Sequence, residues 1–238
     1  MDSLLATGLT FLFCPGGRLG KMVSKGIGAS MIDIKLPPMR RGDPTWSTAL
    51  KYPRQGYWTE HDYFLMEGQD NGLKELSNGY LEVLPMPSLY HQGIAIYMLD
   101  ILRDYLKTIN DRGRVSMAPC PIRFTSKRIR EPDVFYLSEK RLAQTATYPT
   151  GADLIVEVVS GGNVDRRRDL ITKRKEYAKA GIKEYWIIDP KKTIILVLTL
   201  NKATKKYKVH GKYTAGQTAI SKMFKGFSVE VNQVFKKR

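Results

Sequence analysis

Three acidic residues stand in sequence surroundings that are apolar and typical of strands. They are Glu75, Asp133 in the segment 131–135, and Glu157 in the segment 155–159. A lone carboxylate buried in a protein core pays a large desolvation cost, so such a residue normally pairs with a cation or a metal ion. Two or three converging carboxylates would suit Mg²⁺, which prefers hard oxygen ligands and commonly takes one or two carboxylates beside waters and a substrate phosphate.

Each of these acids also has a purely structural explanation. Asp133 follows a proline and could cap a turn, and Glu157 could pair with a helix lysine inside the core. Glu75 lies beside an expected hairpin and could be a half-exposed surface residue, because charged side chains are mostly solvated. The residues alone leave the structural and the chemical interpretation open.

A second set of polar residues follows Glu157 at helical spacing. Asp165, Asp169, Lys173 and Tyr177 recur every four residues, so on a helix they would lie along one face. Such a row is commonly a solvated face with salt bridges between neighbouring turns. Alternatively, Lys173 reaches a metal site beside the end of the strand that carries Glu157, where an ammonium group would stabilise negative charge.

The elements that would position the first acid are a hairpin and a long helix. Strands are expected at 73–77 and 80–84, joined by Asn78-Gly79, a dipeptide suited to the positive φ angles of a tight turn. Ser88 is then a candidate cap for a helix that would end at Gly113, because apolar residues recur there at helical spacing and give one buried face.

The rest of the chain predicts alternating strands and one more helix. The expected elements are strands at 114–117, 122–125 and 133–137, a nearly continuous apolar strand at 153–159, a basic helix over 164–180 closed by Gly181, and strands at 184–188 and 193–200. An apolar run such as 153–159 is typical of a central strand covered on both faces. The order predicts an α/β fold with a mixed β-sheet flanked by helices.

The composition indicates a polyanionic partner. The chain has 238 residues, 42% of them hydrophobic, and a formal net charge of +16 from 39 Lys and Arg against 23 Asp and Glu. Residues 190–238 hold twelve of these bases and a single acid, Glu230. This basic segment is either a solvated surface whose lysines protect exposed strands or a face that contacts phosphates. Nucleic acid is the expected partner.

The N-terminal part has a different character. Residues 1–56 are rich in Gly, Pro and Met without a sustained period and predict a poorly ordered extension, followed by a short helix that Thr59 caps and that ends near Gly68. The apolar stretch 4–13 is too short to cross a bilayer and lacks the flanks of a signal peptide. Cys14 and Cys120 show no spacing of a disulfide framework or a zinc site. A cytoplasmic protein without a membrane partner is expected.

Several of these motifs occur together and in order in a known family. The residues that carry the likeness are Glu75 in 74–83, Pro85–Ser88 followed by His91-Gln92, Glu131-Pro132-Asp133, the run 153–160 around Glu157, Arg168-Asp169 with Lys173 and Tyr177, and the run 184–190. Over residues 57–200 the chain resembles the Uma-two family of restriction-endonuclease-like proteins, which belongs to the PD-(D/E)XK superfamily. The resemblance implies a restriction-endonuclease-like core.

The resemblance also implies a mechanism and a set of roles. Pro132-Asp133 matches the family's Pro-Asp and Glu157 its second acid, which with the Val158 carbonyl would hold Mg²⁺, or Mn²⁺ in its place, for hydrolysis of a phosphodiester. The lysine that the plain superfamily motif places two residues later is Val159 here, and Lys173 matches the position on the helix to which the family moves it. Glu75 matches an early acid that would bind the metal through water. His91, Gln92, Asp169 and Tyr177 are expected to support the site, and His91 is not assigned as a general base.

Three parts of the chain and two classes of function follow. Residues 1–56 would be the extension, 57–200 the nuclease-like domain, and 201–238 a basic, β-rich segment packed on that domain. The first hypothesis is an endonuclease that acts on DNA, with a homodimer compatible with the resemblance. The alternative is a nucleic-acid-binding protein on the same scaffold with weak or no catalysis.

Overall fold

The computed structural model describes residues 52–66, 73–160 and 166–236. Predictions that concern the other residues, among them the extension up to residue 51, the helix end near Gly68 and the position of Asp165, lie outside these ranges. The described elements in chain order are α2 (Glu60–Met66), β1 (Lys74–Ser77), β2 (Tyr80–Val83), α3 (Leu89–Thr108), β3 (Arg114–Met117), β4 (Ile122–Thr125), β5 (Arg128–Arg130), β6 (Val134–Leu137), α4 (Glu139–Ala143), β7 (Leu154–Val158), η1 (Arg168–Lys173), α6 (Arg174–Ala180), β8 (Glu184–Asp189), β9 (Ile194–Asn201), β10 (Lys206–Tyr213), β11 (Thr218–Ile220), β12 (Ser228–Glu230) and α7 (Val231–Val234).

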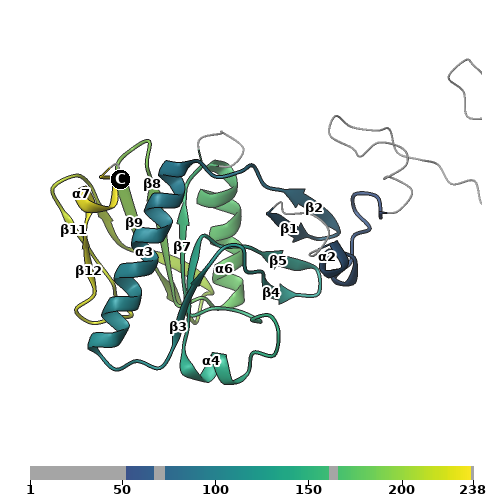
Figure 1. The fold of residues 1–238 in the computed structure, drawn as a ribbon, viewed down its shortest axis with the longest axis horizontal. Helices are drawn as coiled ribbons and strands as arrows, with labels where there is room; N and C mark the ends of the chain where they lie inside the picture. The colour runs from purple at the N-terminus through teal and green to yellow at the C-terminus, as the bar shows by residue number, and fades with distance from the viewer. Residues whose placement is uncertain (1–51, 67–72, 161–165, 237–238) are drawn as a thin grey trace, which may run out of the picture. The chain divides into compact units, whose positions relative to one another are not determined.

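A mixed sheet of six strands is the centre of the fold (Figure 1). Its strand order is β10-β9-β8-β7-β6-β3. β7 and β8 run parallel, whereas β7 and β6 run antiparallel. All five residues of β7 are buried, as expected for a strand covered on both faces. The predicted α/β fold with a mixed sheet flanked by helices is confirmed.

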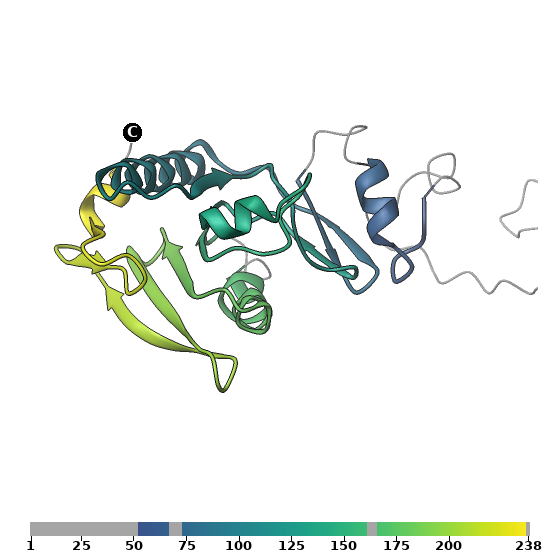
Figure 2. The ribbon, with the colours of Figure 1, turned by 90° about the horizontal axis from the view of Figure 1, so that it is seen from below.

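The two faces of this sheet are covered by different helices, α3 and α6 (Figures 1 and 2). Val156 and Val158 pack in one core with buried residues of α3. Ile155 and Val159 pack in another core with Tyr177 of α6. Because successive side chains of a strand point to opposite faces, Glu157 lies on the face of β7 that α6 covers.

A second, antiparallel sheet has the strand order β2-β1-β5-β4. The β1–β2 turn at Asn78-Gly79 has φ angles of 51° and 85°, as the sequence predicts. The amides of Gly56 and Trp58 donate hydrogen bonds to the Gly79 carbonyl. A side chain at Gly79 would collide with the Gly56 backbone. β5 is a strand that the sequence analysis did not predict, and Leu76 of β1 pairs with its Ile129.

The helix starts follow the predicted caps, but one helix end does not. Thr59 and Asp62 exchange hydrogen bonds at the start of α2, and the Ser88 side chain accepts one from the His91 amide at the start of α3. α3 ends at Thr108 and not at Gly113. Within the described residues, no helix combines the length and the hydropathy needed to cross a bilayer.

The C-terminal elements are attached to β8 through one buried carboxylate. Glu184 is fully buried. One of its oxygens accepts hydrogen bonds from the Trp186 ring (2.7 Å) and the Ser221 hydroxyl (2.6 Å), and the other from the backbone amides of Lys222 (2.7 Å) and Met223 (2.8 Å). All four donors are neutral, and three of them come from the segment between β11 and β12.

Replacing this carboxylate by an amide is therefore expected to weaken the fold. In Glu184→Gln an NH₂ group must face N–H or O–H donors, so the free energy of unfolding should fall by about 2 kcal/mol. Urea denaturation measures the change. Glu230→Gln, which alters an exposed acid, is the control and should stay within about 0.5 kcal/mol of the parent. Equal stability of the two variants would contradict the assigned role of Glu184.

Candidate active site

A small cavity of about 40 Å³ lies between the two sheets, the start of α3 and η1. Its polar lining comes from His91, Glu131, Asp133, Glu157, Ser160, Arg168, Asp169 and Lys173, and its apolar lining from Leu73, Leu84, Pro85, Pro87 and Val158. A volume of this size has room for an ion or a few waters. The structure thus brings Asp133, Glu157 and Lys173, which are far apart in sequence, to one cavity.

Glu157 is held by two residues of the following helix. Its Oε1 accepts hydrogen bonds from Lys173 Nζ at 2.9 Å and from the Tyr177 hydroxyl at 2.5 Å. All three side chains are buried. The spacing of four residues between Lys173 and Tyr177 places both on the helix face toward β7, so this part of the predicted row is a buried site face and not a solvated one.

The helix itself contains an irregular turn at the site. Residues of η1 form a π-helical turn where the sequence predicts a continuous α-helix, and both buried residues of that turn, Asp169 and Lys173, line the cavity. Such turns are found frequently at functional sites. Lys173 Nζ lies 3.6 Å from Asp169 Oδ1, and that oxygen is buried without a hydrogen-bond partner among the described residues.

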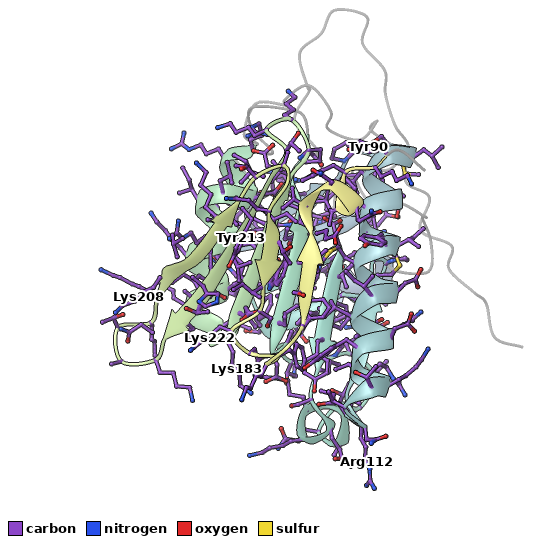
Figure 3. The ribbon with its side chains drawn as sticks, turned by 90° about the vertical axis from the view of Figure 1, so that its left-hand side faces the viewer. Tyr90, Arg112, Lys183, Lys208, Tyr213 and Lys222 are labelled. Carbon is purple, nitrogen blue, oxygen red and sulfur yellow. The ribbon has the colours of Figure 1, made fainter. Side chains whose placement is uncertain are left out.

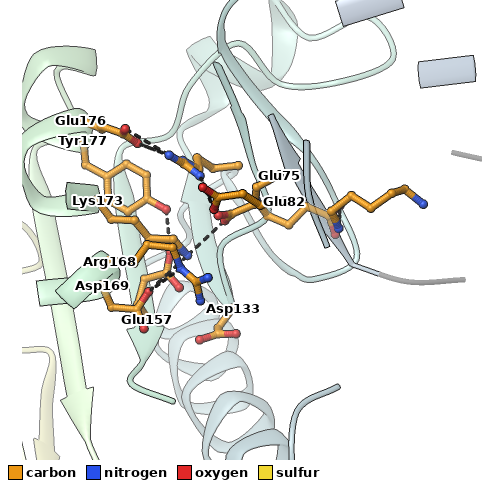
Figure 4. Close-up of polar contacts among 12 residues, drawn as sticks. Glu75, Glu82, Asp133, Glu157, Arg168, Asp169, Lys173, Glu176 and Tyr177 are labelled. Atoms are coloured by element: carbon orange, nitrogen blue, oxygen red, sulfur yellow. Dashed lines mark hydrogen bonds and ion pairs between the residues drawn. The ribbon is translucent and has the colours of Figure 1, made fainter. Parts of the chain in front are cut away.

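Lys173 also connects the helix to the second sheet (Figure 4). Its Nζ lies 3.1 Å from Glu75 Oε1, and Glu75 Oε2 accepts a 2.8 Å hydrogen bond from Arg130. The pairing of Leu76 with Ile129 places Glu75 opposite Arg130 across the two strands. Arg130 in turn donates to both oxygens of Glu176 at 2.9 and 3.1 Å. These four residues form a buried ion-pair network.

Asp133 immediately precedes β6 and lies to one side of that network in Figure 4. Its Oδ2 accepts a 2.7 Å hydrogen bond from the Val158 amide, and its Oδ1 lies 2.9 Å from His91 Nε2. The Val158 amide therefore orients Asp133, whereas the metal contact through the Val158 carbonyl stays a prediction. Because each carboxylate oxygen has two lone pairs, both oxygens of Asp133 keep acceptor capacity.

The electrostatics of the cavity are set by burial and by crowded carboxylates. Burial, together with Asp133, Asp169 and Glu75, raises the pKa of Glu157 to about 8 although Lys173 opposes the shift. Burial opposes the charge of Lys173, but the neighbouring carboxylates outweigh it and raise the pKa of Lys173. The cavity lining thus combines four acids, Glu131, Asp133, Glu157 and Asp169, with the cations Lys173 and Arg168.

His91 follows a similar balance. Burial lowers its pKa, but the hydrogen bond with Asp133 and the charge of that carboxylate outweigh burial and raise the pKa overall. The contact with Asp133 thus favours the charged form of the imidazole. That His91 is not a general base stays a prediction.

The donor chemistry of the cavity fits a divalent cation. Among residues 52–66, 73–160 and 166–236, no three or more His, Cys, Asp or Glu side chains are arranged as a ready metal centre. Mg²⁺, however, commonly takes only one or two carboxylates and completes its shell with water and phosphate. Asp133 and Glu157 line one cavity, and because burial and neighbouring carboxylates raise the pKa of Glu157, a divalent cation there would favour its ionised form.

The other predicted residues divide into two groups. Tyr177 and Asp169 contact the site as described above. Glu75 contacts Lys173, but it is absent from the cavity lining, so the structure supports a role in positioning Lys173 more than metal binding through water. Gln92 lies on the first turn of α3, where its backbone amide donates a hydrogen bond to the Ser88 carbonyl. Among the described residues, no contact of the Gln92 side chain with the site is found.

Sequence reasoning missed two residues of the ion-pair network, Arg130 and Glu176. Arg130 lies on the unpredicted strand β5, where Arg128, Ile129 and Arg130 alternate in type and Ile129 is fully buried. Glu176 follows Lys173 by three residues, which places it on the same side of the helix. The alternation at 128–130 and the spacing from Lys173 to Glu176 can both be read from the sequence. The acid that pairs with a buried arginine, however, cannot be identified without the register of the sheet.

Comparisons with known proteins agree with this picture. The profile of the Uma2 family, described as "Putative restriction endonuclease", matches residues 61–232. Among solved structures, the chain is similar to a protein from Anabaena variabilis described as "a putative nuclease belonging to DUF820", with a TM-score of 0.59 and 14% sequence identity, over 75% of this chain and 97% of that one. No curated protein matches the chain. At this identity the structural likeness supports the fold alone.

The crowding of carboxylates predicts a pH-dependent stability. An acid whose pKa is raised to about 8 in the folded state from 4.5 binds more protons folded than unfolded, so the free energy of unfolding should fall as the pH rises from about 4.5 to about 8. Glu157→Gln should flatten this dependence by about 1 kcal/mol or more. Urea denaturation of both proteins at pH 5.5 and pH 8 measures it.

Divalent metal supplies an independent control for this titration. MnCl₂ should stabilise the parent at pH 8 and should have a smaller effect on Glu157→Gln, because a cation that binds only the folded state stabilises it. Parallel curves of unfolding free energy against pH for the two proteins, with equal responses to Mn²⁺, would contradict both the raised pKa of Glu157 and its part in metal binding.

Proposed function

The chain belongs to the Uma2 family, and from that premise we propose that it is a nuclease that hydrolyses phosphodiester bonds of DNA with Mg²⁺ as cofactor. The observation that carries the proposal is the meeting of Asp133, Glu157 and Lys173 around one cavity. Asp133 immediately precedes β6, Glu157 lies on β7 and Lys173 on η1, and the chain matches its family over the elements that bring them together. Nucleic acid as the substrate also agrees with the net charge of +16.

Asp133 and Glu157 would hold the metal ion. Asp133 is oriented from two sides, by the Val158 amide and by His91, and Glu157 from one side, by Lys173 and Tyr177. A bound Mg²⁺ would offset the charge of a phosphate oxygen and lower the pKa of a bound water. Because hydrogen bonds already orient both carboxylates, they lose little conformational freedom when an ion binds. This favours metal binding at a site with only two protein ligands.

Lys173 would act through its fixed charge and not as a base. Its pKa is raised, so it stays protonated at neutral pH. An ammonium group has three N–H donors. Two are directed at Glu157 and Glu75, at 2.9 and 3.1 Å. The third faces Asp169 at 3.6 Å, beyond hydrogen-bond length, and can reach a water or a phosphate oxygen as charge develops.

A nucleic-acid-binding protein with little catalysis is the second candidate. The net charge of +16 favours it, because this charge supports binding of a polyanion whether or not the site is catalytic. It predicts salt-sensitive binding without a metal effect. The presence of Asp133, Glu157 and Lys173 together favours the nuclease. A homodimer, the location in the cell and the division into three chain segments stay predictions.

Substitution of Asp133 tests the nuclease. Asp133→Asn keeps the size of the side chain and a carbonyl acceptor for the Val158 amide but removes the charge, so Mg²⁺-dependent cleavage of duplex DNA should fall by about 10²-fold or more. Cleavage is measured with supercoiled plasmid and with labelled linear duplexes. DNA binding, measured by fluorescence anisotropy, should persist.

Asp153→Asn is the matched control. Asp153 is a buried acid that accepts a hydrogen bond from the Ser138 amide at 2.9 Å and pairs with Lys183, and it precedes the other end of β7. Its replacement should change stability but leave the rate constant for cleavage within about threefold. Cleavage by Asp133→Asn at the rate of the unaltered protein would contradict the nuclease assignment. If the unaltered protein does not cleave DNA in Mg²⁺ or Mn²⁺, the nucleic-acid-binding protein is favoured.

A further inference from the structure

Over the described residues 166–180, the outer face of the helix behind the cavity carries only positive charge. Arg167, Ile171, Lys175 and Lys179 follow one another every four residues and are all exposed. The acids of η1 and α6, Asp169 and Glu176, are both buried on the opposite side. Since the inner row holds the site residues, the outer row runs along the same helix that supplies Lys173.

This segregation continues beyond the helix. Four acids lie between residues 166 and 206, namely Asp169, Glu176, Glu184 and Asp189, and all four are buried. No exposed acid therefore interrupts the positive surface of this described segment. A solvated helix face usually mixes both signs through salt bridges between neighbouring turns, and this face does not.

The outer row ends at a hollow that lysines surround. Lys179, Lys183, Lys202 and Lys205 line it, together with Ala178, Gly181 and Leu200. Its volume is about 230 Å³, large enough for a phosphate with part of its sugar. The turn that presents Lys202 and Lys205 is fixed by Asn201, whose side chain accepts hydrogen bonds from the amides of Ala203 and Thr204.

The other end of the row lies at the cavity. Arg167 precedes Arg168, whose side chain lines the cavity and lies beside Asp169 and Lys173 in Figure 4. From Arg167 to Lys179 the helix rises roughly 18 Å, the length of about five base pairs of duplex. The positive row and the hollow thus extend over the length of several nucleotides and are not a single anion site.

We propose that the exposed bases of this helix and hollow, Arg167, Lys175, Lys179, Lys183, Lys202 and Lys205, form a track that holds the sugar-phosphate backbone of the nucleic-acid strand leading away from the cavity. The track rests on the proposed function in taking a nucleic acid as substrate, and it adds that the preferred substrate is a polymer that extends several nucleotides beyond the cut. Contacts to phosphates carry no sequence information. The track accounts for affinity and not for the choice of sequence.

The structure provides a matched set of lysines outside the track. Tyr207 of β10 packs in the core beneath α6. Its neighbours Lys206 and Lys208 point to the other side of the strand, because side chains of a strand alternate. Both are exposed, and Figure 3 shows Lys208 projecting from the β9–β10 hairpin. Lys225, also exposed, follows β11 in the C-terminal segment.

Two triple variants with equal changes of charge test the track. The track variant is Lys175→Gln, Lys179→Gln and Lys205→Gln, and the control is Lys206→Gln, Lys208→Gln and Lys225→Gln. Binding to a 30-base-pair DNA duplex is measured by anisotropy in EDTA between 50 and 200 mM KCl. The track variant should lose about 10-fold or more in affinity, and the slope of log K against log salt should become shallower by about 2 to 3, since each phosphate contact contributes about 0.9. The control should change the slope by less than about 1.

Cleavage adds a second measurement. With the long duplex the track variant should show a raised KM with kcat within about twofold, and hydrolysis of bis(p-nitrophenyl) phosphate, which is too short to contact the track, should be unchanged. All altered residues are exposed, so equal thermal melting of the three proteins verifies their folding. The EDTA binding measurement does not need activity, so the track is tested even if the chain proves not to be a nuclease.

Two outcomes would overturn the track. The first is an equal loss of DNA affinity in both variants, which would mean that charge acts diffusely over the surface. The second is unchanged DNA binding by the track variant together with reduced binding to vesicles of phosphatidylserine and phosphatidylcholine, which would assign the lysines to an anionic membrane surface.

Discussion

The site and the packing of the two sheets depend on the ion pairs that the buried ammonium group of Lys173 forms with Glu157 and Glu75. The ammonium group lies within 3.1 Å of carboxylates from β7 and from β1, although burying an ammonium and two carboxylates costs several kcal/mol each before their attraction is counted. The cost is offset only when the helix and both sheets meet with their partners in place. Formation of the site and docking of the second sheet are therefore parts of one event.

Because the ion pairs hold the helix and the two sheets together, most polar residues of the network have a structural role and no direct role in the proposed chemistry. Glu75 and Arg130 face each other across β1 and β5, and Glu176 closes the chain of charges from α6. The charges of Arg130 and Lys173 hold the pKa of Glu75 below its ordinary value in spite of burial. Glu75 therefore remains an anion at neutral pH and can fix Lys173, while Glu157 is left as the carboxylate closest to neutralisation.

The sequence predicts elements better than it predicts their partners. The Asn78-Gly79 turn, the Ser88 cap and the apolar run of β7 depend on local chemistry, and the structure has them at or within a residue or two of the expected positions. The three-residue strand β5 has no such local mark, so Arg130 was missed. The end of α3 was misplaced because the apolar spacing continues to Ile109, whereas the backbone leaves the helix there.

The site shows the same limit. Spacing alone placed Lys173 and Tyr177 on one face, and the family resemblance selected Lys173 for the cavity, but neither could show that Glu75 serves the lysine and does not line the cavity. The contact depends on the docking of a second sheet that no local pattern records. Conversely, the pKa of Glu157 is raised by its burial and by Asp133, Asp169 and Glu75, which only long-range pairing brings together.

The π-helical turn of η1 limits how this chain can change in length. A π-helical turn holds one residue more than an α-helical turn, so deleting a single residue between Asp169 and Lys173 would turn η1 into regular α-helix and shorten their spacing from four residues to three. Exposed Ile171 and Thr172, which lie inside this turn, could accept many side chains but not removal. At these two positions the number of residues, more than their type, therefore maintains the π-helical turn that carries Asp169 and Lys173.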